Sequence, residues 1–227
     1  MLDWLFTPQC IACGIPASTL CEPCARTLLE LGEACALCAE PGASPCPRCR
    51  ATPLPLDRVV SPWRFGGQLA SAIRRLKFGH RPHVARDVAP LWAPLLAAVV
   101  TVHDALVVPV PLHWRRRFVR GYDHTWLLAL HACKSARLPP PRAVLRRVRS
   151  TPPQSTLPAA ARRENLLNAF AVRTHDGLAG RAVALVDDVV TTGSTLAAAA
   201  EALQRAGAST VIGVSLARAA SSTSFPG

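Results

Sequence analysis

The sequence lacks the features that direct a chain into or across a membrane. No basic lead precedes its first apolar residues, and Asp3 and Pro8 break that stretch, so a secretory signal peptide is not expected. Its longest apolar run, residues 88–102, contains Pro90 and Pro94 and falls short of the roughly 20 apolar residues that span a bilayer. We therefore expect a soluble, cytoplasmic protein without membrane insertion, whose thiols stay reduced.

Lysine is also scarce, and the positive charge is unevenly placed. Of the 26 Lys and Arg residues only Lys77 and Lys134 are lysine. Residues 1–57 hold three cations and six carboxylates and thus carry a net charge of −3. Because the whole chain carries +12, residues 58–227 carry +15. Residues 113–163 alone contain twelve Arg or Lys and one carboxylate, Asp123. This density favours binding of phosphate groups, of a small ligand or of a nucleic acid, over a merely solvated basic face.

Cysteine is concentrated at the start of the chain. Eight of the nine cysteines form four Cys-x-x-Cys pairs, and the pattern repeats after 25 residues. In a reducing compartment these pairs predict a module with two structural Zn²⁺ ions rather than disulfides. The repeat favours two successive four-cysteine sites, although a cross-braced pairing stays open. The predicted metal ligands are Cys10, Cys13, Cys21, Cys24, Cys35, Cys38, Cys46 and Cys49, whereas Cys133 is predicted to be a core residue.

The rest of the chain alternates between short apolar runs, typical of strands, and the apolar spacing of helices. Residues 1–57 are predicted to form the zinc module, and a proline-rich stretch at 52–56 leads into a second domain at 58–227. Short apolar runs there indicate buried parallel strands, and they alternate with helical spacing, which predicts an α/β domain. Expected strands are 105–108, 182–186 and 211–216; expected helices are 68–77, 84–100 with a break at its prolines, 124–136 and 194–206.

The most specific stretch is 183–196. An apolar strand ends in Asp187 and Asp188, and a hydroxyl-rich loop then opens directly into a helix. Ligands of open α/β sheets bind at the carboxyl ends of strands, and a helix N-terminus binds phosphate. The two carboxylates suit sugar hydroxyls or a metal ion, and the alternative is a helix capped by Ser194 beside incidental surface aspartates. The predicted phosphate-binding residues are Thr191, Thr192, Gly193, Ser194 and Thr195.

This loop resembles the ribose-phosphate motif of type I phosphoribosyltransferases. Nearly the whole chain resembles the ComF family of competence proteins, which joins a zinc ribbon to a phosphoribosyltransferase-like domain. Besides the cysteine pairs and the loop, the resemblance rests on the segments 76–78, 108–112, 120–122, 151–154 and 162–165.

The resemblance implies a type I phosphoribosyltransferase-like parallel sheet with flanking helices, and a ligand like phosphoribosyl pyrophosphate with Mg²⁺. Asp187 and Asp188 would be the catalytic pair that meets the ribose hydroxyls, and the loop would bind the 5′-phosphate. The pyrophosphate would face Arg115, Arg116, Arg117 and Arg120. Where the family usually has Phe-Asn-Gln, this chain has Tyr122-Asp123-His124, which leaves the second substrate open.

Two functions are compatible with these features. The first is transfer of phosphoribosyl groups, with the family's implied role in DNA uptake during natural transformation. The second is a non-catalytic factor of the competence machinery that binds single-stranded DNA or DNA-uptake proteins. Trp114 and Phe118 lie four residues apart and could stack on bases from one helical face, or be core residues. His113 and His124 are predicted to be structural.

Overall fold

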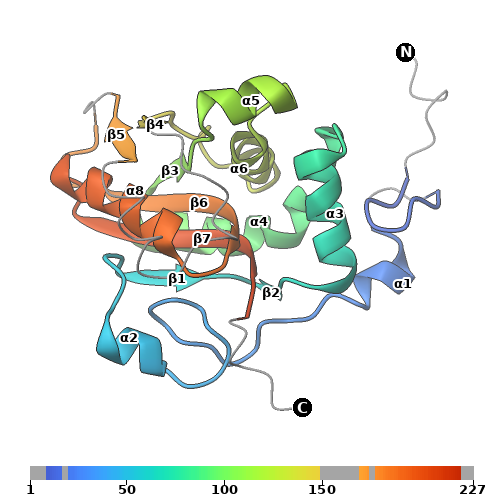
Figure 1. Cartoon of the computed structure of the whole chain (residues 1–227), viewed down its shortest axis with the longest axis horizontal. Coiled ribbons are helices and arrows are strands. Elements are labelled where there is room, and N and C mark those ends of the chain that lie inside the picture. Colours follow the sequence, from blue (N-terminus) through green and yellow to red (C-terminus); the bar gives the residue numbers. More distant parts are fainter. Residues whose placement is uncertain (1–8, 17–19, 149–168, 174–176, 221–227) are drawn as a thin grey trace.

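The computed structural model describes residues 9–16, 20–148, 169–173 and 177–220, and it is built around a parallel sheet (Figure 1). The sheet has five strands in the order β1–β7–β6–β3, and β2 pairs with β7 beyond β1. All these pairings are parallel, so the carboxyl ends of the strands meet at one edge. The strands are β1 (Arg58–Val60), β2 (Trp63–Arg64), β3 (Leu106–Pro109), β6 (Ala182–Val190) and β7 (Thr210–Arg218).

Helices cover both faces of the sheet because its central strand is apolar on both sides. Val183 and Leu185 of β6 face one core, and Ala184 and Val186 face the other; all four are fully buried. One face packs against α3 (Gly67–Phe78), α4 (His83–His103) and α6 (His124–Ser135). The opposite face packs against α8 (Ser194–Arg205) and the antiparallel ribbon of β4 (Leu145–Arg147) and β5 (Phe170–Val172). The predicted α/β class is confirmed.

Helix α4 runs without interruption through Pro90 and Pro94, although the sequence predicts a break there. A proline inside a helix costs about 3 kcal/mol. Burial of Trp92 and Leu96, both fully inaccessible, offsets this cost by about 1.5–3 kcal/mol each. Within the described part of the chain, α4 is the one helix that is long and apolar enough to cross a membrane. Its buried side chains, among them Val88, Trp92 and Leu96, pack in the core on one face of the sheet.

The strand β6 is longer than predicted. The continuous apolar run ends at Val186, but the strand continues to Val190, so Asp187 and Asp188 lie within it. The reason is its neighbour: β7 pairs with β6 as far as the Val190–Arg218 position. Sequence periodicity does not contain this information, because a partner strand supplies the hydrogen bonds that extend the strand.

The cysteine-rich segment wraps two sides of the sheet. It contains the short helices α1 (Glu22–Ala25) and α2 (Pro47–Ala51), which Figure 1 shows near α3 and below the sheet respectively. Arg75 of α3 donates to the carbonyl of Ile11 at 3.3 Å. Just before β1, Asp57 accepts a hydrogen bond from the Val211 N–H at 2.7 Å. The division at residue 57 therefore lies where the chain joins the sheet, and it stays a prediction.

Candidate functional site

The two carboxylates of β6 lie in different surroundings. Because neighbouring residues of a strand point to opposite faces, Asp188 faces the helices α3 and α6. There it is 4% exposed, forms an ion pair with the ammonium of Lys77, and has its Oδ2 3.4 Å from Nε2 of His124. Asp187 is less buried, and its Oδ1 accepts a hydrogen bond from the Asp188 N–H at 2.9 Å.

These surroundings separate the pKa values of the pair. Burial, and then the charge of Asp188, raise the pKa of Asp187 from 3.8 to about 8. Burial also acts to raise the pKa of Asp188, but Lys77 and His124 outweigh it and hold that pKa well below its usual range. Near neutral pH the site therefore presents a protonated carboxyl beside a carboxylate, that is, one hydrogen-bond donor beside acceptors.

A chain of polar contacts leads away from Asp188 to the basic helix α5 (Trp114–Arg120). Nη1 of Arg120 lies 2.8 Å from Nδ1 of His124, whose other nitrogen faces Asp188. The Arg120 guanidinium also lies over the Phe78 ring, 5.4 Å from its centroid. Arg120 is thus connected to the carboxylate pair through a histidine, rather than by direct contact.

Asp123, where the chain departs from the family pattern, is the N-cap of α6. Its Oδ1 accepts from the N–H groups of Thr125 and Trp126, both at 3.1 Å. Its Oδ2 accepts from the Leu112 N–H at 3.0 Å. An amide has only one acceptor oxygen, so the carboxylate satisfies both the helix and the loop before α5. Asp123 thereby also fixes its neighbour His124 against Asp188.

The hydroxyl loop, residues 190–195, runs from the last residue of β6 into the first turn of α8. The N-cap of α8 is Gly193, with φ +77°, and the first helical residue is Ser194. Thr192 Oγ1 accepts from the Ser194 N–H at 3.3 Å and lies 2.8 Å from the Ser194 hydroxyl. Capping by the Ser194 side chain, the alternative interpretation of the sequence, is not what the structure has. The loop and Asp187 line a small hollow of about 20 Å³, to which Thr191, Gly193, Ser194 and Thr195 contribute.

The predicted arginines lie on α5, after β3. Arg115, Arg116 and Arg117 are exposed, and Arg120 is half-buried. His113 is the N-cap of α5 and accepts from the Arg115 N–H at 3.3 Å. Burial, then the charges of Arg147, Arg115 and Arg116, lower the pKa of His113. Positive charge therefore gathers around the start of α5.

The site contains three residues to which the sequence argument gave no site role: Lys77, His124 and Arg147. Arg147 lies on β4, and burial followed by the charge of Arg116 lowers its pKa while the charge of Asp187 acts to raise it. Lys77 had a signal in the sequence, as part of the 76–78 segment that resembles the ComF family, and His124 lies in the 122–124 segment that departs from the family pattern. The segments 151–154 and 162–165 lie outside the described residues.

The cysteines form two clusters, each of two successive pairs. The first cluster is Cys10, Cys13, Cys21 and Cys24, and the second cluster is Cys35, Cys38, Cys46 and Cys49; within each, the four sulfurs lie within 4.8 Å of one another. This is the successive arrangement, not the cross-braced one.

The sulfur positions fit a metal ion. Sγ–Sγ distances are 3.7 Å for Cys13–Cys21 and 3.6 Å for Cys38–Cys46. Tetrahedral zinc with Zn–S bonds of about 2.3 Å places its sulfurs about 3.8 Å apart. In the second cluster the Cys46 N–H also donates to the Cys35 sulfur at 3.3 Å, which orients that sulfur toward its partners. Both clusters could hold metal ions, and their geometry is compatible with structural zinc.

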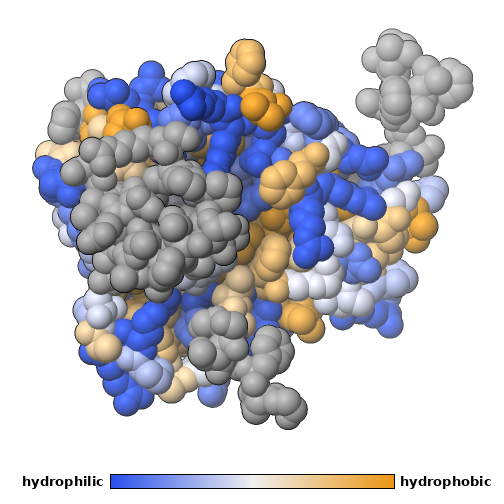
Figure 2. Space-filling model, in the orientation of Figure 1, coloured by the Kyte–Doolittle hydropathy of each residue, from blue (hydrophilic) through white to orange (hydrophobic). Residues whose placement is uncertain are grey.

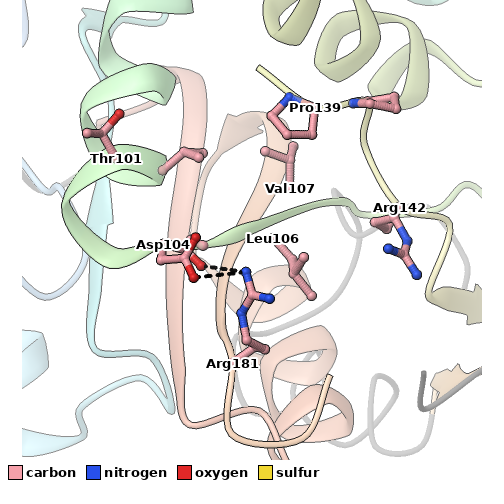
Figure 3. Close-up of a pocket in the computed structure, with 10 residues that line it drawn as sticks. Thr101, Asp104, Leu106, Val107, Pro139, Arg142 and Arg181 are labelled. Carbon is pink, nitrogen blue, oxygen red and sulfur yellow. Dashed lines mark hydrogen bonds and ion pairs between the residues drawn. The ribbon is translucent and has the colours of Figure 1, made fainter. Parts of the chain in front are cut away.

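A larger cavity lies at the opposite edge of the sheet (Figure 3). Its volume is about 260 Å³, and its walls include Leu106 and Arg142. At its rim Arg181 forms an ion pair with Asp104, with 3.2 Å between the charged atoms. None of the predicted site residues lines it, and it lies near the amino ends of β3 and β6. The larger cavity is therefore separate from the carboxylate pair and the hydroxyl loop.

Comparison with known proteins agrees with this geometry. Residues 135–226 match the phosphoribosyl transferase domain, so β6, the hydroxyl loop and α8 belong to a domain of the phosphoribosyltransferase class. The chain is 34% identical over 216 residues to DNA utilization protein YhgH of Salmonella typhimurium, covering 89% of this chain and 93% of that protein. It is 35% identical over 213 residues to the protein of that name from Escherichia coli O157:H7, with the same coverage.

A third relative is competence protein F of Haemophilus influenzae, which is 30% identical over 226 residues, or 94% of this chain and 98% of that protein. The chain therefore belongs to the ComF family. The family predicted from the sequence is confirmed.

Replacement of Asp187 tests whether its pKa is raised while that of Asp188 is lowered. Between about pH 5 and pH 8 the unfolded chain has released the Asp187 proton while the folded chain retains it, so folding becomes less favourable as the pH rises. Asp188 has a lowered pKa and is ionised in both states over this range, so it adds no slope. Asp187→Asn is therefore expected to raise the melting temperature relative to wild type, increasingly from about pH 5 to pH 8.

Thermal unfolding at stepped pH measures this difference. Asp104→Asn removes a carboxylate that is 91% exposed and far from the pair, and serves as the control. A melting-temperature difference for Asp187→Asn that stays constant across the pH range contradicts the raised pKa.

Proposed function

We propose that the chain binds phosphoribosyl pyrophosphate or a related ribose phosphate at the carboxyl edge of its sheet. The observation that carries the proposal is the juxtaposition of the carboxylate pair of β6 with the N-terminus of α8. The free N–H groups and positive dipole end of a helix attract a phosphate, and adjacent carboxyl groups suit two neighbouring sugar hydroxyls. One ribose phosphate carries both a phosphate and two neighbouring hydroxyls.

Each part of the site would then have one task. The hydroxyl loop binds the 5′-phosphate, Asp188 accepts from one ribose hydroxyl, and protonated Asp187 exchanges hydrogen bonds with the other. The arginines at the start of α5 face the pyrophosphate, for which guanidinium forks are well suited. Mg²⁺ bound with the ligand would neutralise part of the pyrophosphate charge. Lys77 keeps Asp188 ionised and in place.

The relatives' names support a proposal about the biological role. They are called competence protein F and DNA utilization protein, so we propose a role in DNA uptake or in the use of imported DNA. Such a role, and eight cysteines in two clusters, fit a cytoplasmic chain that binds structural zinc. Whether the chain transfers the phosphoribosyl group to an acceptor or only senses the ligand is decided by a product screen with the nucleobases.

A second candidate function, binding of single-stranded DNA, is favoured by the surface of α5. Trp114 and Phe118 are 64% and 86% exposed, so they are not core residues. Three arginines of α5, residues 115–117, lie between them in sequence, and Figure 2 shows apolar groups among hydrophilic ones in this part of the surface. Exposed aromatic rings among cations are the combination by which single-strand binders hold bases and backbone.

Calorimetric titration with phosphoribosyl pyrophosphate and Mg²⁺ tests the first proposal. Wild type is expected to bind, and Asp187→Asn/Asp188→Asn to bind at least tenfold more weakly, because the lost hydrogen bond to the charged carboxylate of Asp188 is worth about 1.5–3 kcal/mol. Asp104→Asn, at the other edge of the sheet, is expected to match wild type. Equal affinity in the double variant and wild type would show that the ligand binds elsewhere.

Metal analysis tests the clusters. Purified protein is expected to contain two zinc ions per chain, one for each four-cysteine cluster. Cys13→Ser is expected to lower the content to about one ion, because three thiolates bind zinc more weakly than four. Cys133→Ser, at the buried cysteine outside the clusters, is the control and should leave the content unchanged. A chain with no bound metal would refute the assignment.

Titration of a fluorescent oligothymidylate tests the second candidate. Trp114→Ala/Phe118→Ala is expected to weaken binding by about 1–3 kcal/mol for each stacked base that is lost. Val102→Ala, which trims another exposed apolar side chain on α4, is the control. If wild type binds no oligonucleotide at low salt, or if the aromatic variant binds as wild type does, α5 is not a DNA-stacking surface.

A further inference from the structure

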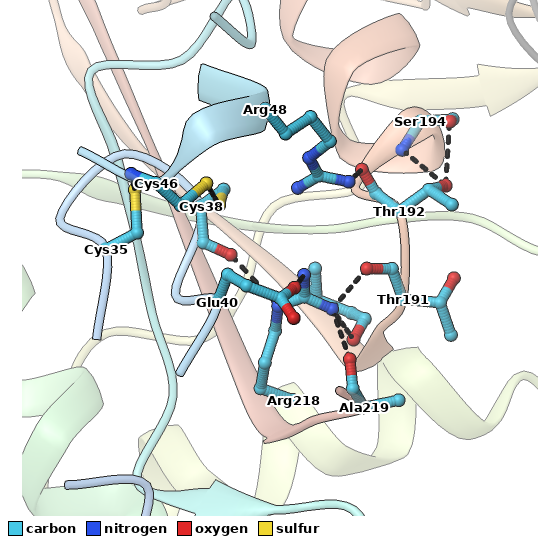
Figure 4. A network of polar contacts seen from close by, with 11 residues as sticks. Cys35, Cys38, Glu40, Cys46, Arg48, Thr191, Thr192, Ser194, Arg218 and Ala219 are labelled. Atoms are coloured by element: carbon cyan, nitrogen blue, oxygen red, sulfur yellow. Dashed lines mark hydrogen bonds and ion pairs between the residues drawn. The ribbon is translucent and has the colours of Figure 1, made fainter. Parts of the chain in front are cut away.

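A buried guanidinium connects the hydroxyl loop with the cysteine-rich segment. Arg218, the last residue of β7, is completely buried, and its Nη1 donates to the carbonyls of Val190, at 3.0 Å, and Thr191. On its other side, Nε donates to the Cys38 carbonyl at 3.1 Å, and Nη2 pairs with the carboxylate of Glu40. One side chain thus joins the second cysteine cluster to the loop (Figure 4).

Glu40 is itself part of the turn that carries two cysteines of that cluster. The Cys35 N–H donates to the Glu40 carbonyl at 2.8 Å, and the Ala39 N–H to the Cys35 carbonyl at 2.7 Å. These bonds close the turn that presents Cys35 and Cys38. The position of the Glu40 carboxylate, and hence of Arg218, therefore depends on the folding of the turn around its metal ligands.

A second tie comes from the other half of the same cluster. Arg48 lies on α2, between Cys46 and Cys49, and its Nη1 donates to the Thr192 carbonyl at 2.8 Å (Figure 4). Arg48 and Arg218 together hold three successive carbonyls of the loop. Because the carbonyls are engaged on this side, the loop is restrained in one conformation at the start of α8.

A third contact is apolar. Leu54 packs against the second cluster, and its Cδ1 lies only 2.7 Å from where a Cβ on Gly193 would be. Gly193 has φ +77°, so glycine there satisfies both the backbone conformation and the close approach of Leu54. The segment of the second cluster thus contacts the loop directly at Thr192 and Gly193, and it reaches Thr191 through Arg218.

We propose that the second cluster fixes the conformation of the hydroxyl loop through the positioning residues Arg48 and Arg218, so that metal binding at the cluster and anion binding at the loop strengthen each other. The anion-binding half rests on the proposed function, whereas the control of the loop does not. Coupling of this kind is reciprocal, so each ligand raises the affinity for the other by the same factor. The cluster is then a support for the site as well as a fold-stabilising element.

Arg48 is the better probe, because it is exposed and its loss leaves the buried Arg218–Glu40 pair intact. Arg50 provides the matched control: it lies on the same short helix, has the same charge, and donates to the Pro45 carbonyl at 3.1 Å instead of to the loop. Arg48→Lys retains the positive charge and a hydrogen-bond donor group, so it should perturb the loop less than Arg48→Ala does.

Hydrogen–deuterium exchange of the full-length, zinc-loaded chain tests control of the loop without any ligand. In Arg48→Ala the amides of residues 191–197 are expected to exchange at least about tenfold faster, the factor for one lost hydrogen bond to a charged donor. Arg50→Ala is expected to match wild type, and the β7 core at 211–216 to be unchanged in all variants. Loop exchange in Arg48→Ala equal to that of wild type overturns the proposal.

A second experiment measures binding of phosphoribosyl pyrophosphate with Mg²⁺. It distinguishes failure of the proposed coupling from failure of the proposed function. Arg48→Ala should bind it severalfold more weakly than Arg50→Ala, and the ligand should raise zinc affinity in a chelator competition with wild type. If wild type binds the ligand but the two variants bind it equally, the coupling is refuted and the proposed function stands. If wild type binds no ligand while loop exchange still rises in Arg48→Ala, control of the loop stands and the proposed function fails.

Discussion

The site depends on the parallel pairing of β6 with β7 and β3. β6 forms hydrogen bonds with both neighbours, and its pairing with β7 continues to the Val190–Arg218 position. That extension places Asp187 and Asp188 at the carboxyl edge and brings Arg218 level with the hydroxyl loop. A parallel sheet gathers strand ends at one edge, so the carboxylates, the loop and the helix α5 that follows β3 converge there.

Around this edge the chain balances several buried charges. Asp188 is ionised because Lys77 and His124 surround it, and Arg218 is charged against Glu40 and a set of carbonyls. Buried charges persist in proteins only when they are paired and hydrogen-bonded. The carboxylate beside the ammonium of Lys77 and the guanidinium beside the loop are therefore held in fixed positions by their partners.

Much of this could be predicted from the sequence. The four cysteine pairs and the favoured successive arrangement follow from the repeat, the α/β class from apolar runs that alternate with helical spacing, and the order of strand, acids, hydroxyls and helix from residues 183–196 alone. Errors occurred where neighbours decide the outcome. The prolines of α4 do not break that helix, because burial of its apolar side chains offsets the cost of the prolines. Strand β6 extends beyond its apolar run because β7 continues to pair with it.

The sequence by itself determined which chemical groups are close in the chain: the cysteine pairs, the adjacent acids, and the loop that begins α8. Only the tertiary structure decided which distant groups join them. Lys77 meets Asp188 across 111 residues, and Glu40 meets Arg218 across 178. Local patterns record hydrogen bonding and burial along one element, whereas a charge pair between elements depends on how those elements pack, and a single charged residue has no periodicity to reveal its partner.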